Sequence, residues 1–355
     1  MDMKNKIMFF IPTMIGGGAE RVVSILSGEF VLCGYEVEIV VYRMVEKTYP
    51  MNDKVRLTPL YGTKNAGHTS LFNRLKLIRN IVKERKPDYV ISFLTSVNMN
   101  VCLATIGLPC KVIVSERNDP KQIGGGLNKL KRNIAYHFAD KFVFQTRQAM
   151  KCFSVSIQKR SKVILNPILG TFPTRNFSEK RIVAVGRLNY QKNYPLLLKS
   201  FASIVQRYPD YKLEIYGDGE LYDKLYQISK DLCIQDKVFF MGFQKNIHEC
   251  IKNACMYVMS SDFEGLPNAL LEAMCIGIPC ISTDCPCGGP AEVIQNRVNG
   301  MLVSVNDEHE LTEAMLYYIE NPQIAEQHGH KAKDLSIRLE YKNIATQWID
   351  FIQNN

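Results

Sequence analysis

Residues 264–272 have the sequence Glu264-Gly265-Leu266-Pro267-Asn268-Ala269-Leu270-Leu271-Glu272. The residues just before them, 255–261, are mostly apolar and predict a short, buried parallel strand. Pro267 suits the first turn of a helix, and the leucines after it give that helix an apolar face. The pattern therefore predicts Glu264 in a strand-to-helix loop and Glu272 facing inward from the helix. Both would lie at the carboxyl edge of a sheet, where open α/β sheets bind ligands.

The two carboxylates suggest a ligand with neighbouring hydroxyl groups. Ionised carboxylates only accept hydrogen bonds, so the vicinal hydroxyls of a sugar or a ribose match them. The alternative is an exposed loop glutamate and a solvated helix glutamate. The glutamate pair alone favours that alternative. The other motifs of the chain are therefore needed to choose between the two interpretations.

Strand-like and helix-like segments alternate along the chain of 355 residues, which is too long for one ordinary domain. This alternation predicts an α/β fold of two Rossmann-like, doubly wound domains with parallel sheets. A turn-rich stretch from Asn166 to Asn176 indicates a linker. The predicted boundaries are 1–168 for the first domain, 169–178 for the linker, 179–335 for the second domain and 336–355 for a terminal helix.

The net charge of +9 is unevenly distributed. Residues 1–170 hold 26 Lys and Arg against 12 Asp and Glu, whereas residues 171–355 hold 18 against 23. A basic first half predicts an anionic partner. Basic residues at 74–86 and 129–132 alternate with Leu and Ile at helical spacing, which is typical of a face that contacts an anionic membrane. Ordinary solvated helix faces remain the alternative; a nucleic-acid partner is disfavoured because no binding module is present.

The eleven cysteines are scattered and form no C-x-x-C pair. This pattern disfavours a disulfide framework or a zinc site and is typical of a reducing cytosol. No apolar run reaches 18 residues, so no transmembrane helix is expected. The sequence thus predicts a cytoplasmic protein. Its basic helix faces also allow for peripheral binding to the inner face of the cell membrane.

A glycine-rich loop, Gly16-Gly17-Gly18, lies between the first predicted strand and the first predicted helix. Glycines there let backbone N–H groups approach an anion at the helix N-terminus. A dinucleotide fingerprint would need a small residue at position 21, which is Arg21. A purely structural tight turn is the other interpretation.

Two cations in the loop at 186–193 suit a diphosphate. Arg187 and Lys192 are five residues apart after the first strand of the second domain. The Arg offers a planar fork and the Lys a point charge, so both could hold a diphosphate and stabilise its developing charge. No D-x-D triad occurs, so no bound metal ion is expected. Two solvated loop cations are the alternative.

In their order along the chain, four motifs resemble retaining glycosyltransferases of family 4, which have the two-domain GT-B architecture. They are G-G-A-E-R at 17–21, G-R-L…K-N at 186–193, the glutamate pair, and G-G-P-x-E at 288–292. The resemblance implies that Glu264 orients the donor sugar, that Arg187 and Lys192 hold the diphosphate, and that Glu272 holds the ribose. It also implies that the last helix packs back on the first domain, and that donor and acceptor meet in a cleft between the domains.

The resemblance implies further substrate-binding positions. Many relatives carry a His in the loop where this chain has Glu116, Arg117 and Asn118. The sequence does not show which group takes the place of that His. The other implied positions lie in the glycine loop, near the base and beside Glu264: Gly17, Gly18, Gly217, Gly242, Phe243, Gly265, Leu266, Pro267 and Asn268.

The expected activity is therefore retaining, metal-independent transfer of a hexose or N-acetylhexosamine. The expected donor is a nucleotide sugar, with UDP as the favoured nucleotide, and no cofactor is expected. The expected acceptor is a polyprenyl diphosphate-linked saccharide of surface polysaccharide or glycan biosynthesis. Two alternatives stay open: a nucleotide-sugar epimerase, which would convert the donor without an acceptor, and a dinucleotide oxidoreductase, which the mismatch at Arg21 disfavours.

Overall fold

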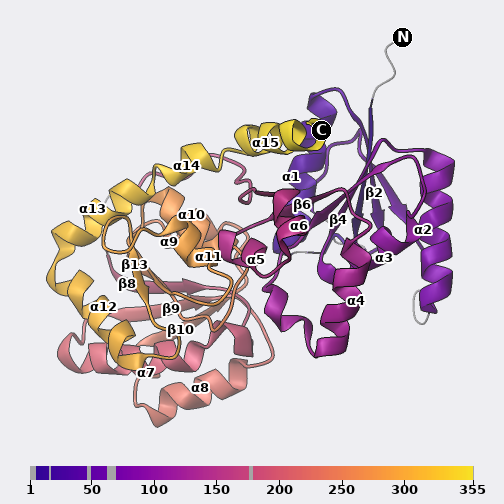
Figure 1. Ribbon diagram of the computed structural model, residues 1–355. Helices are drawn as coiled ribbons and strands as arrows, with labels where there is room; N and C mark the ends of the chain where they lie inside the picture. The colour runs from indigo at the N-terminus through magenta and orange to yellow at the C-terminus, as the bar shows by residue number, and fades with distance from the viewer. Residues whose placement is uncertain (1–4, 16, 46–48, 62–68, 176–178, 355) are drawn as a thin grey trace. The chain divides into compact units, whose positions relative to one another are not determined.

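A computed structural model describes residues 5–15, 17–45, 49–61, 69–175 and 179–354. The chain forms two compact units, Met1–Leu169 with Leu339–Asn355, and Gly170–Arg338 (Figure 1). Residues 170–175 and 336–338, which the sequence analysis assigned to a linker and to the terminal helix, belong to the second unit; the predicted linker residues 176–178 lie outside the described residues.

The first unit is built on a seven-stranded parallel sheet with the order β3-β2-β1-β4-β5-β6-β7. The strands are β1 (Lys6–Ile11), β2 (Glu36–Val41), β3 (Arg56–Pro59), β4 (Tyr89–Phe93), β5 (Lys111–Ser115), β6 (Lys141–Phe144) and β7 (Ser161–Val163). The helices are α1 (Gly18–Leu32), α2 (Leu71–Arg85), α3 (Thr95–Ala104), α4 (Gly126–Tyr136), α5 (Arg147–Lys151), α6 (Val155–Lys159) and α15 (Tyr341–Gln353), with a 3-10 turn η1 (Pro120–Ile123).

The central strand β1 is apolar on both sides, as expected for a strand covered by helices on both faces. Alternate residues of a strand point to opposite faces. Ile7, Phe9 and Ile11 join the core that contains residues of α1 and α15, while Met8 and Phe10 are buried on the opposite face. In that first core the fully buried Trp348 of α15 stacks on Phe93, with ring centroids 6.0 Å apart.

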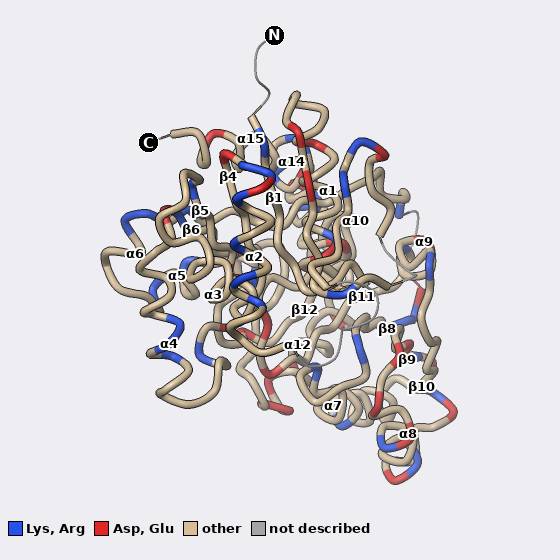
Figure 2. Tube along the Cα trace, turned by 90° about the vertical axis from the view of Figure 1, so that its right-hand side faces the viewer, with Lys and Arg blue, Asp and Glu red and all other residues tan. Residues whose placement is uncertain are grey.

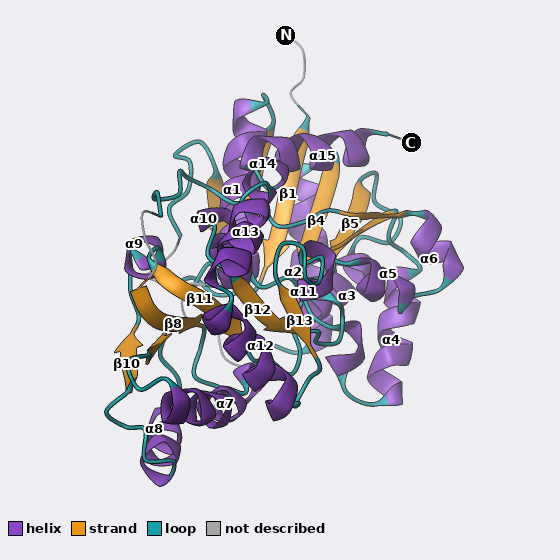
Figure 3. Cartoon of the chain, turned by 90° about the vertical axis from the view of Figure 1, so that its left-hand side faces the viewer, coloured by secondary structure: helices purple, strands orange, loops and turns teal. Residues whose placement is uncertain are grey.

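The second unit has a six-stranded parallel sheet with the order β10-β9-β8-β11-β12-β13 (Figure 3). Its strands are β8 (Glu179–Val185), β9 (Lys212–Tyr216), β10 (Val238–Gly242), β11 (Ala254–Met259), β12 (Cys280–Thr283) and β13 (Met301–Val303). Its helices are α7 (Tyr194–Arg207), α8 (Tyr222–Asp231), α9 (Ile247–Ile251), α10 (Asn268–Ile276), α11 (Gly289–Val293), α12 (Glu308–Glu320), α13 (Pro322–Ala332) and α14 (Leu335–Arg338), with a 3-10 turn η2 (Tyr190–Lys192).

The structure confirms the predicted α/β fold with two parallel, Rossmann-like sheets. Where the sequence predicts one terminal helix at 336–355, the structure has two, because the chain leaves the helical conformation between α14 and α15. The buried Leu339 accepts a hydrogen bond from the backbone N–H of Ile168 (2.9 Å), and Glu340 forms a parallel bridge with Ile168. This strand-like pairing ends α14 before α15 begins. Among the described residues, no helix has the length and apolar character needed to cross a membrane.

Candidate active site in the second unit

The side chains of Lys192 and Glu264 form an ion pair at the carboxyl edge of the second sheet. Lys192 ends η2, in the loop after β8, and Glu264 lies in the loop after β11. Lys192 Nζ is 2.6 Å from Glu264 Oε1, and Ser261 Oγ donates to the same oxygen at 3.0 Å. The two side chains are only 15% and 10% exposed, which strengthens their attraction relative to a surface pair. The predicted diphosphate-binding cation and sugar-binding acid are therefore direct partners in this structure.

Backbone and side-chain hydrogen bonds join the two loops that carry this pair. Gln191 accepts from the backbone N–H of Asp262 (2.9 Å) and donates its amide to the carbonyl of Phe263 (2.9 Å). Asn193 donates to the Asp262 carboxylate at 2.7 Å, and Ser260 Oγ donates to the Lys192 carbonyl at 2.9 Å. These bonds position the lysine and the glutamate together, since neither loop can shift without breaking bonds to the other.

Arg187 lies in the same loop as Lys192, but its side chain is exposed. Within the described part of the chain it makes no side-chain hydrogen bond or ion pair, whereas Lys192 is neutralised by Glu264. The site thus offers one paired cation and one exposed cation from a single loop. An exposed guanidinium is suited to a ligand with several oxygens, because its fork donates several hydrogen bonds in one plane.

Glu272 faces inward from α10 and is buried, as the apolar spacing of that helix predicts. Its Oε2 lies 3.1 Å from Nε2 of His248 in α9. The two atoms are within ionic distance, although the angle does not make a directed hydrogen bond. This contact could not be predicted from the sequence, because His248 lies in a five-residue helix with no recognisable motif.

Close backbone contacts explain two glycines of the predicted motifs. A Cβ at Gly217, which has a φ of +131°, would lie 2.2 Å from the carbonyl oxygen of Gly186. A Cβ at Gly289 would lie 1.7 Å from the carbonyl oxygen of Gly265, beside the glutamate loop. The G-G-P-x-E motif therefore packs directly against the segment that carries Glu264.

The other predicted positions of the second unit surround this edge. Leu266 and Pro267 are buried, and Asn268 is the first residue of α10. Gly242 ends β10 and accepts a hydrogen bond from the N–H of Gly217 at 2.9 Å. Phe243 follows it and is 77% exposed, so its ring is available to a ligand.

Two of the predicted residues of the first unit, Glu116 and Arg117, are buried. Glu116 is 2% exposed, accepts hydrogen bonds from Thr95 (2.9 Å) and Tyr136, and has its pKa raised by burial. The guanidinium of Arg117 lies over the rings of Phe93 (4.6 Å) and Trp348 (5.7 Å).

Arg117 also donates to Asn166 Oδ1 at 2.8 Å, and burial lowers its pKa to about 9. Both Glu116 and Arg117 therefore have structural contacts inside the unit, while Asn118 is exposed. Gly17 precedes α1 as its N-cap and Gly18 is its first residue. Gly16 lies outside the described residues.

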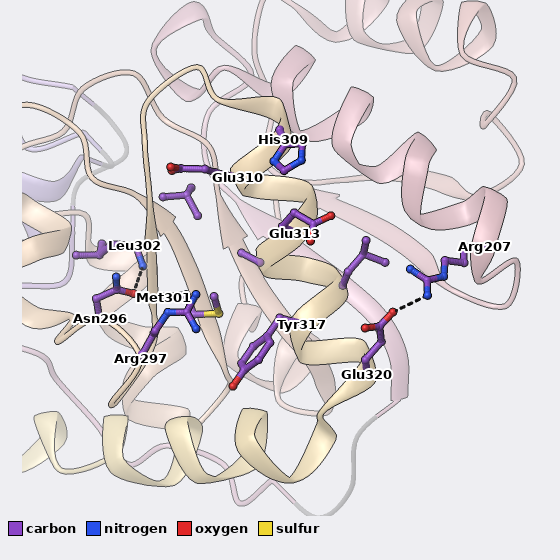
Figure 4. A pocket seen from close by; sticks show the side chains of 13 residues that line it. Arg207, Asn296, Arg297, Met301, Leu302, His309, Glu310, Glu313, Tyr317 and Glu320 are labelled. Carbon is purple, nitrogen blue, oxygen red and sulfur yellow. Dashed lines mark hydrogen bonds and ion pairs between the residues drawn. The ribbon is translucent and has the colours of Figure 1, made fainter.

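A cavity of about 480 Å³ lies elsewhere in the second unit, along the edge strand β13 and helix α12 (Figure 4). Acidic and basic side chains line it, among them Arg297, Glu313 and Glu320, and Glu320 pairs with Arg207 at 3.1 Å. None of the predicted site residues lines this cavity. It has no evident relation to the Lys192–Glu264 pair.

Comparisons with known proteins agree with this geometry. Residues 173–335 match the family model "Glycosyl transferases group 1". A Methanocaldococcus jannaschii protein described as an uncharacterized glycosyltransferase is 31% identical over 72% of this chain and 68% of its own length. A Campylobacter jejuni α-1,4-N-acetyl-D-galactosaminyltransferase, whose name gives a diphosphoundecaprenol-linked saccharide as its substrate, is 29% identical over 98% of each chain.

Among solved structures, Anabaena HepE in complex with UDP shares the fold, with a TM-score of 0.80 and 18% identity over 98% of this chain and 99% of its own. The solved structure supports the fold alone, whereas the sequence relatives carry the family assignment. The chain belongs to the group 1 glycosyl transferases.

Proposed function

We propose that this glycosyltransferase retains the donor's anomeric configuration, needs no bound metal ion, and transfers a hexose or N-acetylhexosamine from a UDP sugar to a polyprenyl diphosphate-linked saccharide, releasing UDP. The observation that carries the proposal is the buried Lys192–Glu264 pair beside the exposed Arg187. The donor is inferred from HepE, which was solved with UDP, and the acceptor from the substrate named for the Campylobacter jejuni relative.

In this proposal the two cations stabilise the leaving nucleoside diphosphate. Negative charge builds up on the diphosphate as the bond to the anomeric carbon breaks, and fixed cations lower the energy of that state. Arg187 is free to approach the phosphate oxygens, and Lys192 is already held in place by Glu264 and Ser260. The protein therefore supplies the charge that a metal ion would supply in other enzymes.

Glu264 orients the donor sugar. Lys192 and Ser261 hold its carboxylate in place, so the sugar hydroxyls can donate only to the lone pairs that these two partners leave unused. Glu272 accepts from the ribose hydroxyls. The acceptor hydroxyl attacks the face that the diphosphate leaves, so the configuration is retained. Catalysis then depends mainly on positioning and on stabilising the leaving group.

The acceptor would reach the enzyme at an anionic membrane surface through α4 and α2 of the first unit. Helix α4 exposes Leu127, Leu130 and Ile134 beside Lys129 and Lys131. Its other side is fixed by Arg132, which donates to the carbonyl of Pro120 at 2.8 Å. Figure 2 shows Lys and Arg along both α2 and α4. Apolar side chains between cations suit a membrane interface with anionic lipids.

The experiment is to incubate the protein with UDP-N-acetylhexosamines, a polyprenyl diphosphate-linked saccharide and excess EDTA, and to read the new linkage by proton NMR. We expect a product with the donor's anomeric configuration and an unchanged rate in EDTA. An inverted linkage would rule out the retaining mechanism, and loss of activity restored by a divalent cation would rule out metal independence. Conversion of the donor without acceptor would favour the epimerase alternative.

A further inference from the structure

His248 lies between Glu272 and the segment through which the chain enters the second unit. Its Nε2 is 3.1 Å from Glu272 Oε2, and its ring lies 5.2 Å from the ring of Phe172 at an angle of 48°. Phe172 belongs to residues 170–175, at the start of that unit. We propose that His248 is a positioning residue that fixes the orientation and the charge of Glu272 for binding the ribose of a nucleoside diphosphate.

This inference rests on the proposed function, in which Glu272 accepts hydrogen bonds from the ribose hydroxyls. A carboxylate in a helix, with a side chain only 8% exposed, is costly to keep ionised unless nearby groups favour its charge. An imidazolium at 3.1 Å favours the ionised form, because opposite charges attract strongly at low exposure. The ionised carboxylate has two acceptor oxygens and no donor, so it can accept from two neighbouring hydroxyls, one at each oxygen.

The other charged groups around His248 have partners of their own. On α9, Lys252 pairs with Glu249 at 2.7 Å. On the segment that carries Phe172, Arg175 pairs with Glu326 and donates to the carbonyl of Ala254 at 3.1 Å. On α10, the acid that faces the imidazole is Glu272. Of these charged groups, Glu272 is therefore the one that the imidazole of His248 contacts directly.

The buried Nε2 of His248 makes no directed hydrogen bond in this structure. A ribose hydroxyl that donates to Glu272 would come close to Nε2 of His248 and could form a hydrogen bond with it as well. Phe172 restricts the imidazole ring from the other side. Removing the Phe172 ring should therefore weaken the effect of His248 without changing either charge.

The test is the affinity for a UDP sugar, whose diphosphate has no proton that titrates in this range, measured by calorimetry between about pH 5 and pH 8, where imidazoles titrate. In the wild type we expect affinity to fall as the pH rises. For His248→Gln we expect affinity at low pH to be about fivefold weaker, as for the loss of one charge-assisted contact, so that the wild-type increase toward low pH is lost. Phe172→Ala should give an intermediate profile. KM for the donor should rise in His248→Gln while kcat stays close to that of the wild type.

The matched control is His309→Gln, which changes an exposed histidine of α12 in the same unit and should keep the wild-type profile. A thermal unfolding scan of each variant shows whether the fold is intact. If His248→Gln retains the wild-type pH profile, the inference is wrong although the proposed function stands. If the wild type binds no nucleoside diphosphate, the proposed function fails, and this inference fails with it.

Discussion

The carboxyl edges of the two sheets both carry a glutamate near a cation, but the pairs differ in their partners. In the second unit Glu264 pairs with Lys192 across two loops, next to the exposed Arg187. In the first unit Glu116 and Arg117 are consecutive, and each is bound inside the unit. Arg117 lies against two aromatic rings and has no carboxylate partner among the described residues.

This difference shows that a polar residue at a strand end is a site residue only if the following elements leave it accessible. In the second unit, glycines such as Gly217 and Gly289 keep the neighbouring loops close to each other and low in side-chain bulk. In the first unit, α4 and α15 supply Tyr136 and Trp348, which cover the glutamate and the arginine. The glutamate and the arginine of the first edge are thus enclosed, whereas the second edge leaves the side chain of Arg187 exposed.

Replacing Trp348 tests the covered edge and should have the largest effect. Trp348→Ala removes a fully buried ring that stacks on Phe93 and covers Arg117. We expect the first unit to lose about 3–5 kcal/mol of its free energy of unfolding. Urea unfolding followed by circular dichroism measures this, and Trp348→Phe, which keeps a ring on Phe93, is the control with the smaller loss. Unchanged unfolding of Trp348→Ala would mean that α15 is not part of this core.

Replacing Lys192 tests the accessible edge. Lys192→Ala removes a diphosphate-binding cation and leaves Glu264 without its ionic partner. We expect kcat/KM for the donor to fall by about 10²–10³, as for other losses of transition-state stabilisation. The control is Lys199→Ala, an exposed lysine of α7 in the same unit, which should keep wild-type kinetics. Equal activity of the two variants would remove Lys192 from the site.

Replacing Glu116 tests the covered edge of the first unit through the pH dependence of stability. Burial raises the pKa of Glu116 above its ordinary value of 4.5, so the folded unit holds this proton more tightly than the unfolded chain does. The stability that the protonated acid contributes is complete below pH 4.5 and is lost as the pH rises through the folded pKa. Glu116→Gln cannot lose a proton, so its stability relative to the wild type should increase over that range. Each unit of the pKa rise corresponds to about 1.4 kcal/mol.

The single tryptophan, Trp348, lies in the first unit, so its fluorescence reports the unfolding of that unit. Unfolding of wild type and Glu116→Gln in urea at several pH values gives the difference directly. Other carboxylates affect both proteins alike and cancel in this difference. A difference that stays constant with pH would mean that Glu116 is ionised in the folded unit throughout.

Much of the fold and part of the site could be predicted, because both depend on local patterns. Apolar runs at 89–93, 111–115 and 212–216 predict three strands, and the structure has β4, β5 and β9 at these bounds. Helix α3 was missed because Asn98 and Asn100 interrupt its apolar spacing; both are buried, and Asn98 donates to the carbonyl of Ser115 at 3.0 Å. Strand β3 was missed because it is short and ends in Pro59, which weakens a strand pattern.

Which side chains become partners could not be predicted. The loops of Lys192 and Glu264 are 72 residues apart, so their pairing follows from the order of strands β8 and β11 in the sheet. Likewise, the burial of Arg117 depends on Trp348, which lies more than two hundred residues further along the chain. Spacing along the sequence shows which chemical groups reach an edge, and long-range packing decides which of them stay accessible.

The exposed surface of the first unit gives the smallest expected effect. Leu130 and Ile134 are 56% and 55% exposed on α4 although they are apolar, and Lys129 and Lys131 flank Leu130 in the sequence. The double variant Leu130→Ser and Ile134→Ser should bind anionic vesicles several-fold less, because it buries less apolar surface at the interface. Its affinity for UDP should not change, since the donor residues lie in the second unit.

Leu32→Ser is the matched control, because Leu32 is also an exposed leucine of this unit but lies at the end of α1, outside the basic helices. Vesicle co-sedimentation at low and high salt separates the two contributions. Salt should reduce the binding that depends on the lysines and leave the part that depends on the apolar side chains. If the double variant and the control bind vesicles equally, α4 does not contact the membrane, and the basic faces of the first unit are ordinary solvated helix surfaces.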